Sequence, residues 1–161
     1  MAKPIPDGFH TLTPHLIVKG AAEAIDFYKK AFNAREAERH TMPDGKTIMH
    51  ARINIGDSVV MLADEFPPKA LSPKSRGGTS VFLHIYVEDA DTLFDRAVKA
   101  GCVVRMPLMD QFWGDRYGQL EDPYGHCWSI ATHKQDLTPA QLEANAKAAF
   151  AKMSHAPAEC T

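Results

Sequence analysis

The 161-residue chain lacks the features that mark several large classes of protein. No apolar run approaches the roughly 20 residues that span a bilayer, and the opening residues, MAKPIPDGFHT, hold no apolar signal segment. Its three cysteines, Cys102, Cys127 and Cys160, are odd in number and have no paired spacing, which argues against a disulfide framework. These absences favour a cytoplasmic protein with structural, unpaired cysteines.

An excess of charge of one sign is also missing. The chain has 18 basic and 20 acidic residues, a net charge of −2 and a pI of about 6.4. It therefore has no overall basic character for binding nucleic acid or an anionic membrane surface. With 45% hydrophobic and 24% charged residues, the composition is that of a soluble globular protein. We expect a single domain over residues 1–161.

Two windows of the chain repeat at an offset of 69 residues. PHLIVKGAAEAIDFYKKAF at 14–32 and LHIYVEDADTLFDRAVKAG at 83–101 align without a gap, and the match places His15 on His84. In both windows the apolar period changes from 2 to about 3.6 at the same place, which predicts a strand followed by a helix. In the second window, Asp89 is suited to cap the helix and Gly101 to end it.

Three further strands are predicted after each helix, because short runs of apolar residues are separated there by turn sequences. In the first half they cover about 35–41, 47–55 and 58–63, and in the second half about 102–108, 113–121 and 126–132. Each half therefore has the order β-α-β-β-β.

These modules occupy residues 10–63 and 79–133, and the segment 64–78, rich in Pro, Gly and Lys, links them. We expect an α+β fold in which the two modules form one cup-shaped mixed sheet with the helices outside. A last helix is predicted over 137–153, where Thr138 and Gln141 form a capping box.

These features resemble the vicinal oxygen chelate superfamily, which includes glyoxalase I, extradiol dioxygenases, fosfomycin-modifying enzymes and bleomycin-resistance proteins. The paired modules, the segment AIDFYKKAF and the ending DPYGHCWSIATH carry the resemblance, and FWGDRYGQLEDPYGHCWSIATH is typical of the PhnB-like branch. The resemblance covers roughly residues 10–135. It implies the fold more specifically than the activity, because one fold hosts many chemistries.

The resemblance also implies where a metal would bind. Metal-using members take one ligand from the first and one from the last strand of each half, usually His, Gln or Glu. Those positions fall on Thr13, Met61 (or Val60 if the register slips), Phe82 and Ser129. Because Phe and Met offer no suitable donor for such an ion, we expect no cofactor and no glyoxalase I activity. Added Zn or Ni should then leave thermal stability nearly unchanged.

His15 and His84 leave an alternative open. Each lies two residues beyond the expected ligand position and therefore on the same face of its strand. A pseudo-twofold between the halves would bring both imidazoles toward one cavity. They then either line a ligand pocket, or form a shifted divalent metal site with Glu121 or His50.

The predicted strand 113–121 presents Asp115, Tyr117, Gln119 and Glu121 on one face. By the offset of 69, Gln119 corresponds to His50 and Glu121 to Arg52. At a cavity rim, aromatic and guanidinium groups suit a planar or anionic small molecule; the alternative is a hairpin stabilised by cross-strand pairs. The candidate ligand-binding residues are His15, His50, Phe82, His84, Tyr86, Trp113, Arg116, Tyr117 and Ser129.

Three functions follow from this sequence. The first is metal-independent binding of a small molecule, as in drug-sequestering resistance proteins. The second is a metal-dependent lyase, isomerase or transferase that uses His15 and His84, and the third is a structural or interaction module. Catalysis is left open because no catalytic motif is complete. A homodimer is expected, because exposed sheet edges need covering and dimers are common among the proteins that this chain resembles.

Overall fold

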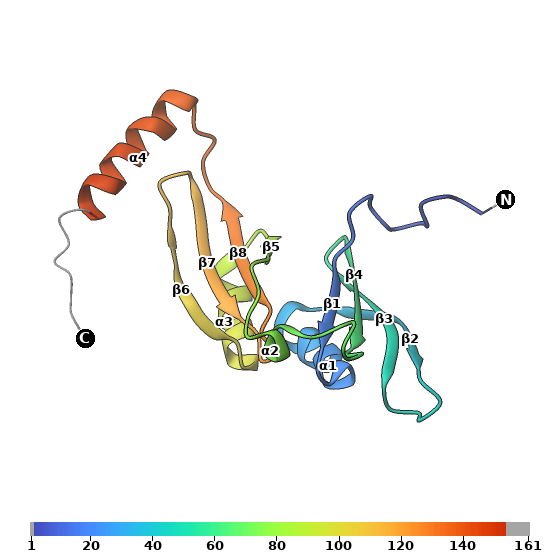
Figure 1. The fold of residues 1–161 in the computed structure, drawn as a ribbon. Coiled ribbons are helices and arrows are strands. Elements are labelled where there is room, and N and C mark those ends of the chain that lie inside the picture. Colours follow the sequence, from blue (N-terminus) through green and yellow to red (C-terminus); the bar gives the residue numbers. More distant parts are fainter. Residues whose placement is uncertain (1, 154–161) are drawn as a thin grey trace, which may run out of the picture.

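A computed structural model describes residues 2–153 and confirms the α+β fold of two β-α-β-β-β modules with a C-terminal helix (Figure 1). The elements, in chain order, are β1 (His15–Val18), α1 (Ala21–Phe32), β2 (Arg35–Thr41), β3 (Ile48–Ile55), β4 (Ser58–Asp64), α2 (Pro73–Arg76), β5 (Phe82–Tyr86), α3 (Ala90–Ala100), β6 (Val103–Asp110), β7 (Asp115–Glu121), β8 (Cys127–His133) and α4 (Pro139–Met153).

The strands form two mixed four-stranded sheets. Sheet 1 has the order β1-β4-β3-β2, and sheet 2 repeats it as β5-β8-β7-β6. In each sheet the first strand is parallel to the last, and the other pairs are antiparallel. Within residues 2–153 no ladder joins sheet 1 to sheet 2, so the strands are divided between two sheets rather than joined in one. Figure 1 shows sheet 2 on the left and sheet 1 on the right.

Three local features differ from the sequence prediction. The first strand begins at His15, because Pro14 has no N–H to donate to a ladder. The segment that includes Trp113 is a turn between β6 and β7 rather than the start of a strand. The linker contains a short helix, α2, which Pro73 begins and which the hydroxyl of Ser72 caps by accepting from the Ser75 N–H.

The helix ends follow from local hydrogen bonds. Asp89 caps α3 by accepting from the Thr92 N–H (3.0 Å), as predicted. The capping box of α4 is also present, because the Thr138 N–H donates to Gln141 Oε1 (2.9 Å) and the Gln141 N–H donates to Thr138 Oγ1 (3.3 Å). At α1, by contrast, the cap comes from a distant residue.

That distant residue is Asp64, at the end of β4. Its Oδ1 accepts from the N–H groups of Gly20 (2.9 Å) and Ala21 (2.8 Å), which are the first donors of α1. Its Oδ2 accepts from the Ile48 N–H at the start of β3 (2.7 Å). One carboxylate therefore satisfies donors that the start of the helix leaves unpaired and ties α1 to sheet 1.

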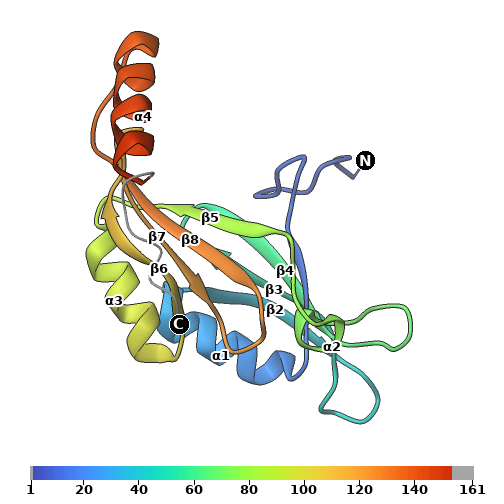
Figure 2. The same cartoon turned by 60° about the vertical axis from the view of Figure 1, so that its left-hand side comes forward.

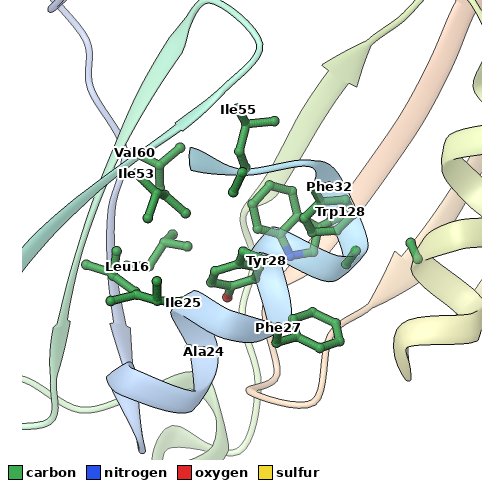
Figure 3. Close-up of a cluster of buried hydrophobic side chains, with 14 of the residues drawn as sticks. Leu16, Ala24, Ile25, Phe27, Tyr28, Phe32, Ile53, Ile55, Val60 and Trp128 are labelled. Atoms are coloured by element: carbon green, nitrogen blue, oxygen red, sulfur yellow. The ribbon is translucent and has the colours of Figure 1, made fainter. Parts of the chain in front are cut away.

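A single hydrophobic core lies between the helices and the two sheets. Tyr28 and Phe32 of α1 pack against Trp128 of β8, with ring centroids 5.5 and 4.5 Å apart (Figure 3). Trp128 is 2% exposed, which confirms its predicted place in the core. Sheet 1 contributes Leu16, Val18, Ile53, Val60 and Leu62 to this core, and sheet 2 contributes Leu120 and Ile130.

A buried carboxylate, Asp122, joins the two modules within this core. Its Oδ2 accepts from the Tyr28 hydroxyl (2.7 Å) and from Trp128 Nε1 (2.8 Å). Its Oδ1 accepts from the N–H groups of Tyr124 (2.9 Å) and His126 (3.0 Å). Because a buried charge is costly unless it is hydrogen-bonded, all four donors stabilise this arrangement. Burial, reinforced by the Asp122 charge, raises the pKa of Tyr28 well above its ordinary value.

The C-terminal helix α4 extends away from both sheets (Figure 2). It touches the rest of the chain at Phe112, through the ring of Phe150 (centroids 5.7 Å apart) and through Asn145 Nδ2, which donates to the Phe112 carbonyl (3.2 Å). Most of its residues are exposed, Leu142 among them. In residues 2–153 no helix is both long and apolar enough to cross a membrane.

We predict that Tyr28→Phe lowers the free energy of unfolding by about 1.5 kcal/mol, the low end for a hydrogen bond to a charged group. The low end applies because Asp122 keeps its other three donors. Urea denaturation measures the change. Tyr124→Phe is the control, because the Tyr124 hydroxyl makes no hydrogen bond to any described residue and its loss should change stability by less than about 0.5 kcal/mol. Equal losses in both variants would contradict the role of Asp122.

Candidate functional site

Each sheet has one face turned away from the core and its helices, which we call its open face. Because side chains alternate along a strand, the residues between the buried core positions share this face. On sheet 1 they include His15, Ile17, Glu38, His40, His50, Arg52 and Met61. On sheet 2 they include Phe82, His84, Tyr86, Asp115, Tyr117, Gln119, Glu121, Ser129 and His133.

Asp115 is the centre of the open face of sheet 2. Although it is only 5% exposed, its Oδ2 accepts from the Tyr86 hydroxyl (3.0 Å) and Trp113 Nε1 (3.2 Å), and its Oδ1 accepts from His133 Nδ1 (2.7 Å). Burial opposes ionisation, but the hydrogen bonds from His133 and Tyr86 outweigh it and hold the pKa of Asp115 below its usual value. One carboxylate therefore fixes three rings contributed by β5, β8 and the β6–β7 turn.

His84 lies beside this network. Its Nδ1 is 2.7 Å from the hydroxyl of Ser129, which is buried. Its ring stacks on Tyr117 (centroids 5.8 Å apart) and meets Tyr86 edge-on (4.4 Å). Burial lowers the pKa of His84, against the opposing charge of Asp115, so the imidazole is neutral near pH 7. Within residues 2–153 its Nε2 makes no hydrogen bond, which leaves that nitrogen for a ligand.

Histidines gather on the open face of sheet 1. The ring of His50 meets His15 edge-on (centroids 5.9 Å apart) and stacks on His40 (6.3 Å). Glu38 lies 3.7 Å from His50 Nε2 and 3.6 Å from an Arg52 nitrogen. Burial, followed by the charge of His50, lowers the pKa of His15. This face therefore offers imidazole and guanidinium donors where sheet 2 offers aromatic rings.

The structure brings most of the predicted site residues together, but in two groups. Phe82, His84, Tyr86, Tyr117 and Ser129 share the open face of sheet 2, and Trp113 joins them through Asp115. His15 and His50 meet on sheet 1. Each of the two groups makes its ring contacts within its own sheet, so a cavity shared by His15 and His84 stays a prediction.

Arg116 lies apart from the open face, so its predicted part in a ligand site gains no support from its position. It alternates with Asp115 and Tyr117 along β7 and so points to the helix side of sheet 2. There its guanidinium donates to both carboxylate oxygens of Asp91 on α3 (2.6 Å each) and to Asp110 (3.2 Å).

The constant offset between the halves was wrong beyond the first strand. On sheet 1, His15 is opposite Met61 and Met61 is opposite Arg52. On sheet 2, His84 is opposite Ser129 and Ser129 is opposite Gln119. In chain order the offset is therefore 69 (84 − 15), 67 (119 − 52) and 68 (129 − 61). The reason is that the second half has fewer residues between its first and third strands but a longer connection between β7 and β8 than between β3 and β4. Gln119 corresponds to Arg52 rather than to His50.

The structure divides the inherited and the shifted metal positions between the two sheets and the segment before β1. Met61 and Ser129 lie on open faces, Val60 is in the core, and Thr13 precedes β1. For the shifted site, His15 lies on sheet 1, His84 contacts Ser129, and Glu121 accepts from Arg105 Nε (2.9 Å). No group of three or more His, Cys, Asp or Glu within residues 2–153 is placed to hold a metal ion.

Two members of the site were missed from the sequence, namely Asp115 as its centre and His133. The alternation of β7 and β8 places both on the open face, and they are directly opposite each other. The cysteines are structural where they are described: burial raises the pKa of Cys102 to about 12 and, with Glu121, raises that of Cys127. Cys160 lies outside the described residues.

His133 makes the stability of this network depend on pH. Its Nδ1 faces Asp115 and its Nε2 faces Asp136 (3.0 Å), and these hydrogen bonds raise its pKa above 6.5. A raised pKa means that the contribution of His133 is complete below pH 6.5 and is lost as the pH rises through the folded-state value. Asp115 stays ionised over that range because its own pKa is lowered.

We predict that His133→Gln lowers the melting temperature more at about pH 5.5 than at about pH 8.5, since only the lower pH keeps the imidazolium charged. Differential scanning calorimetry of the wild type and the variant at both pH values measures the difference. His10→Gln, a substitution in the exposed N-terminal segment, is the control and should behave like the wild type. A loss of equal size at both pH values would mean that the ion pair with Asp115 has no role.

Comparisons with known proteins agree with the fold. A family model described as Glyoxalase/Bleomycin resistance protein/Dioxygenase superfamily matches residues 8–130. The uncharacterized protein Rv0887c of Mycobacterium tuberculosis is 47% identical over 137 residues, which cover 83% of this chain and 80% of that protein.

Solved structures give the same result. TioX from Micromonospora sp. ML1 has a TM-score of 0.60 at 28% sequence identity, over 80% of this chain and 100% of that one. A PhnB protein from Bacillus cereus, described as a putative 3-demethylubiquinone-9 3-methyltransferase, has a TM-score of 0.60 at 20% identity, over 76% of this chain and 99% of that one. At that identity the second likeness concerns the fold alone.

Proposed function

Because the chain belongs to the glyoxalase/bleomycin resistance/dioxygenase superfamily, we propose that it binds a small molecule and does so without the superfamily's metal site. The observation that carries this proposal is the buried carboxylate of Asp115, which holds Tyr86, Trp113 and His133 on the open face of sheet 2. The ligand contacts this face.

The composition of the face supports binding. Ligand sites combine apolar and aromatic surface with a few placed polar groups. Here the aromatic surface comes from Tyr86, Trp113 and Tyr117, and the polar groups are His84 Nε2 and the Gln119 amide, which also donates to the Tyr117 hydroxyl (2.9 Å). Rings that are already fixed lose little conformational freedom when a ligand arrives.

Cross-strand stabilisation of a hairpin is a weaker explanation for these contacts. Such pairs join neighbouring strands, as His133 on β8 does with Asp115. The other two donors come from β5, which is not a neighbour of β7, and from the turn before β7. Asp115 is also outside the hydrophobic core. A buried charge in this place is better explained by the rings that it orients than by packing.

The enzyme alternative is less favoured. A metal-dependent lyase, isomerase or transferase using His15 and His84 needs one ion to meet ligands from both sheets. No group of three or more His, Cys, Asp or Glu within residues 2–153 is placed to hold such an ion. Glyoxalase I chemistry in particular needs strong stabilisation of a developing oxyanion. We propose that the protein lacks that activity and that added Zn or Ni leaves its melting temperature nearly unchanged.

We predict that the neutral aromatic dye N-phenyl-1-naphthylamine quenches the fluorescence of Trp113 while Trp128, which is buried, changes little. Tyr117→Leu should weaken dye binding by about 3- to 10-fold, as expected for the loss of an aromatic contact. Fluorescence titration measures both the quenching and the affinity for the dye. Trp113→Phe should remove most of the quenching. Tyr124→Phe is the control. Failure of a folded protein to bind the dye, or quenching confined to Trp128, would contradict a site on sheet 2.

We also propose that the protein is a homodimer. Among the described residues no strand pairs with the outer edges of β1 and β5, and exposed edges tend to associate unless they are covered. In addition, α4 contacts its own chain at Phe112 while Leu142 and Phe150 stay 39% and 58% exposed. A second copy that packs on α4 would bury these side chains and would suit an isologous interface.

We predict that light scattering at micromolar concentration gives a mass twice the 17.8 kDa of the chain. Leu142→Glu should shift the protein toward the monomer, because a carboxylate would have to be buried against the second copy. Lys147→Glu, an exposed change on the same helix, is the control for helix charge and should leave the mass unchanged. A wild-type protein with the mass of one chain would refute the dimer.

A further inference from the structure

We propose that the open face of sheet 1 is a separate binding site for a small organic oxyanion, a carboxylate or phosphonate, held by Arg52 together with His15 and His50. This site is distinct from the aromatic face of sheet 2. It adds a ligand chemistry that the proposed function does not specify.

The three side chains converge because of the register of sheet 1. His15 on β1, Met61 on β4 and Arg52 on β3 form one row of opposed residues across neighbouring strands. Two strand spacings put the Cα atoms of His15 and Arg52 about 10 Å apart, which two long side chains can bridge around one small anion. His50 lies two residues from Arg52 on the same face, and its ring is 5.9 Å from that of His15.

The guanidinium of Arg52 has unused hydrogen-bonding capacity. Within residues 2–153 it donates no hydrogen bond, and its nearest carboxylate, Glu38, is 3.6 Å from one terminal nitrogen. Both forks of a guanidinium that bind carboxylates and phosphates bidentately include that terminal nitrogen. At 3.6 Å it donates no hydrogen bond to Glu38, so it can still donate to a ligand oxyanion. Arg116 and Arg105, by contrast, both donate to carboxylates.

The surroundings of Arg52 would strengthen its attraction for an anion. Its side chain is 28% exposed, and the ring of Phe9 lies 5.3 Å from its Cζ atom. Met61 is directly opposite it on the neighbouring strand. Partial exclusion of water lowers the effective dielectric constant and increases the interaction between charges. An aromatic or aliphatic body next to the oxyanion would contact Phe9 and Met61.

The simplest competing explanation is that Arg52 is only a surface residue, held by the Phe9 ring and a loose pair with Glu38. Exposed pairs of that kind contribute little to stability, and a cation–π contact needs no ligand. This explanation predicts that anions do not distinguish Arg52 from other arginines. An experiment can therefore separate the two.

The test is a titration of ¹⁵N-labelled full-length protein with benzoate and phenylphosphonate, followed by two-dimensional amide NMR, with neutral benzamide as the matched probe. Both anions should shift the amides of His15, His50 and Arg52, and benzamide should not. Arg52→Gln should weaken binding of the anions by about 10-fold or more, as expected for lost hydrogen bonds to a charged group. Arg52→Lys should give an intermediate loss because it keeps the charge without the fork.

Arg105→Gln is the control, because Arg105 also lies on a sheet but is paired with Glu121, and its loss should leave anion binding unchanged. Equal affinity for benzamide and benzoate, or an Arg52→Gln variant that binds the anions as well as the wild type, would overturn the proposal. Shifts confined to residues around Trp113 would overturn it too, while supporting a site on sheet 2. The variant should still bind N-phenyl-1-naphthylamine, so failure of this site is distinguishable from failure of the proposed function.

Discussion

The packing of the two modules depends most on the hydrogen bonds that a buried carboxylate, that of Asp122, must accept. Asp122 is 2% exposed and accepts from Tyr28 on α1, from Trp128 on β8 and from two backbone N–H groups of its own turn. Because any misplacement would leave the charge unpaired, α1 of the first module can pack on the second module in few ways. The position of α1 in turn orients sheet 1, to which Asp64 ties its first turn.

The same combination of residue types recurs on the open face of sheet 2 with another consequence. Asp115 accepts from a tyrosine hydroxyl and a tryptophan N–H, those of Tyr86 and Trp113, as Asp122 does in the core. In the core such a network fixes how two modules pack, whereas on an open face it fixes rings that a ligand can meet. The third donor to Asp115 is His133, so the stability of this network depends on pH. The remaining donors to Asp122 are backbone N–H groups, which do not titrate.

The two modules share their topology but present different side chains on equivalent positions. The row His15, Met61 and Arg52 of sheet 1 corresponds to the row His84, Ser129 and Gln119 of sheet 2. A duplicated fold therefore carries a basic and imidazole-rich face beside an aromatic one. Since function depends on such sites rather than on the fold, membership of the superfamily by itself does not decide what each face binds.

The sequence by itself determined the β-α-β-β-β order of each module, the caps of α3 and α4 and the burial of Trp128, because apolar periods and capping act over a few residues. It did not reveal the short helix α2. Through the resemblance to the superfamily it grouped Met61 and Ser129 with Thr13 and Phe82, whereas the structure places them opposite His15 and His84. Only the tertiary structure decided that Asp64 caps α1, that Arg116 pairs with Asp91, and that the offset between the modules varies from strand to strand. Loop lengths and partners distant in the chain set these features. A carboxylate in the sequence does not reveal which distant donors will meet it, because that depends on how the modules pack.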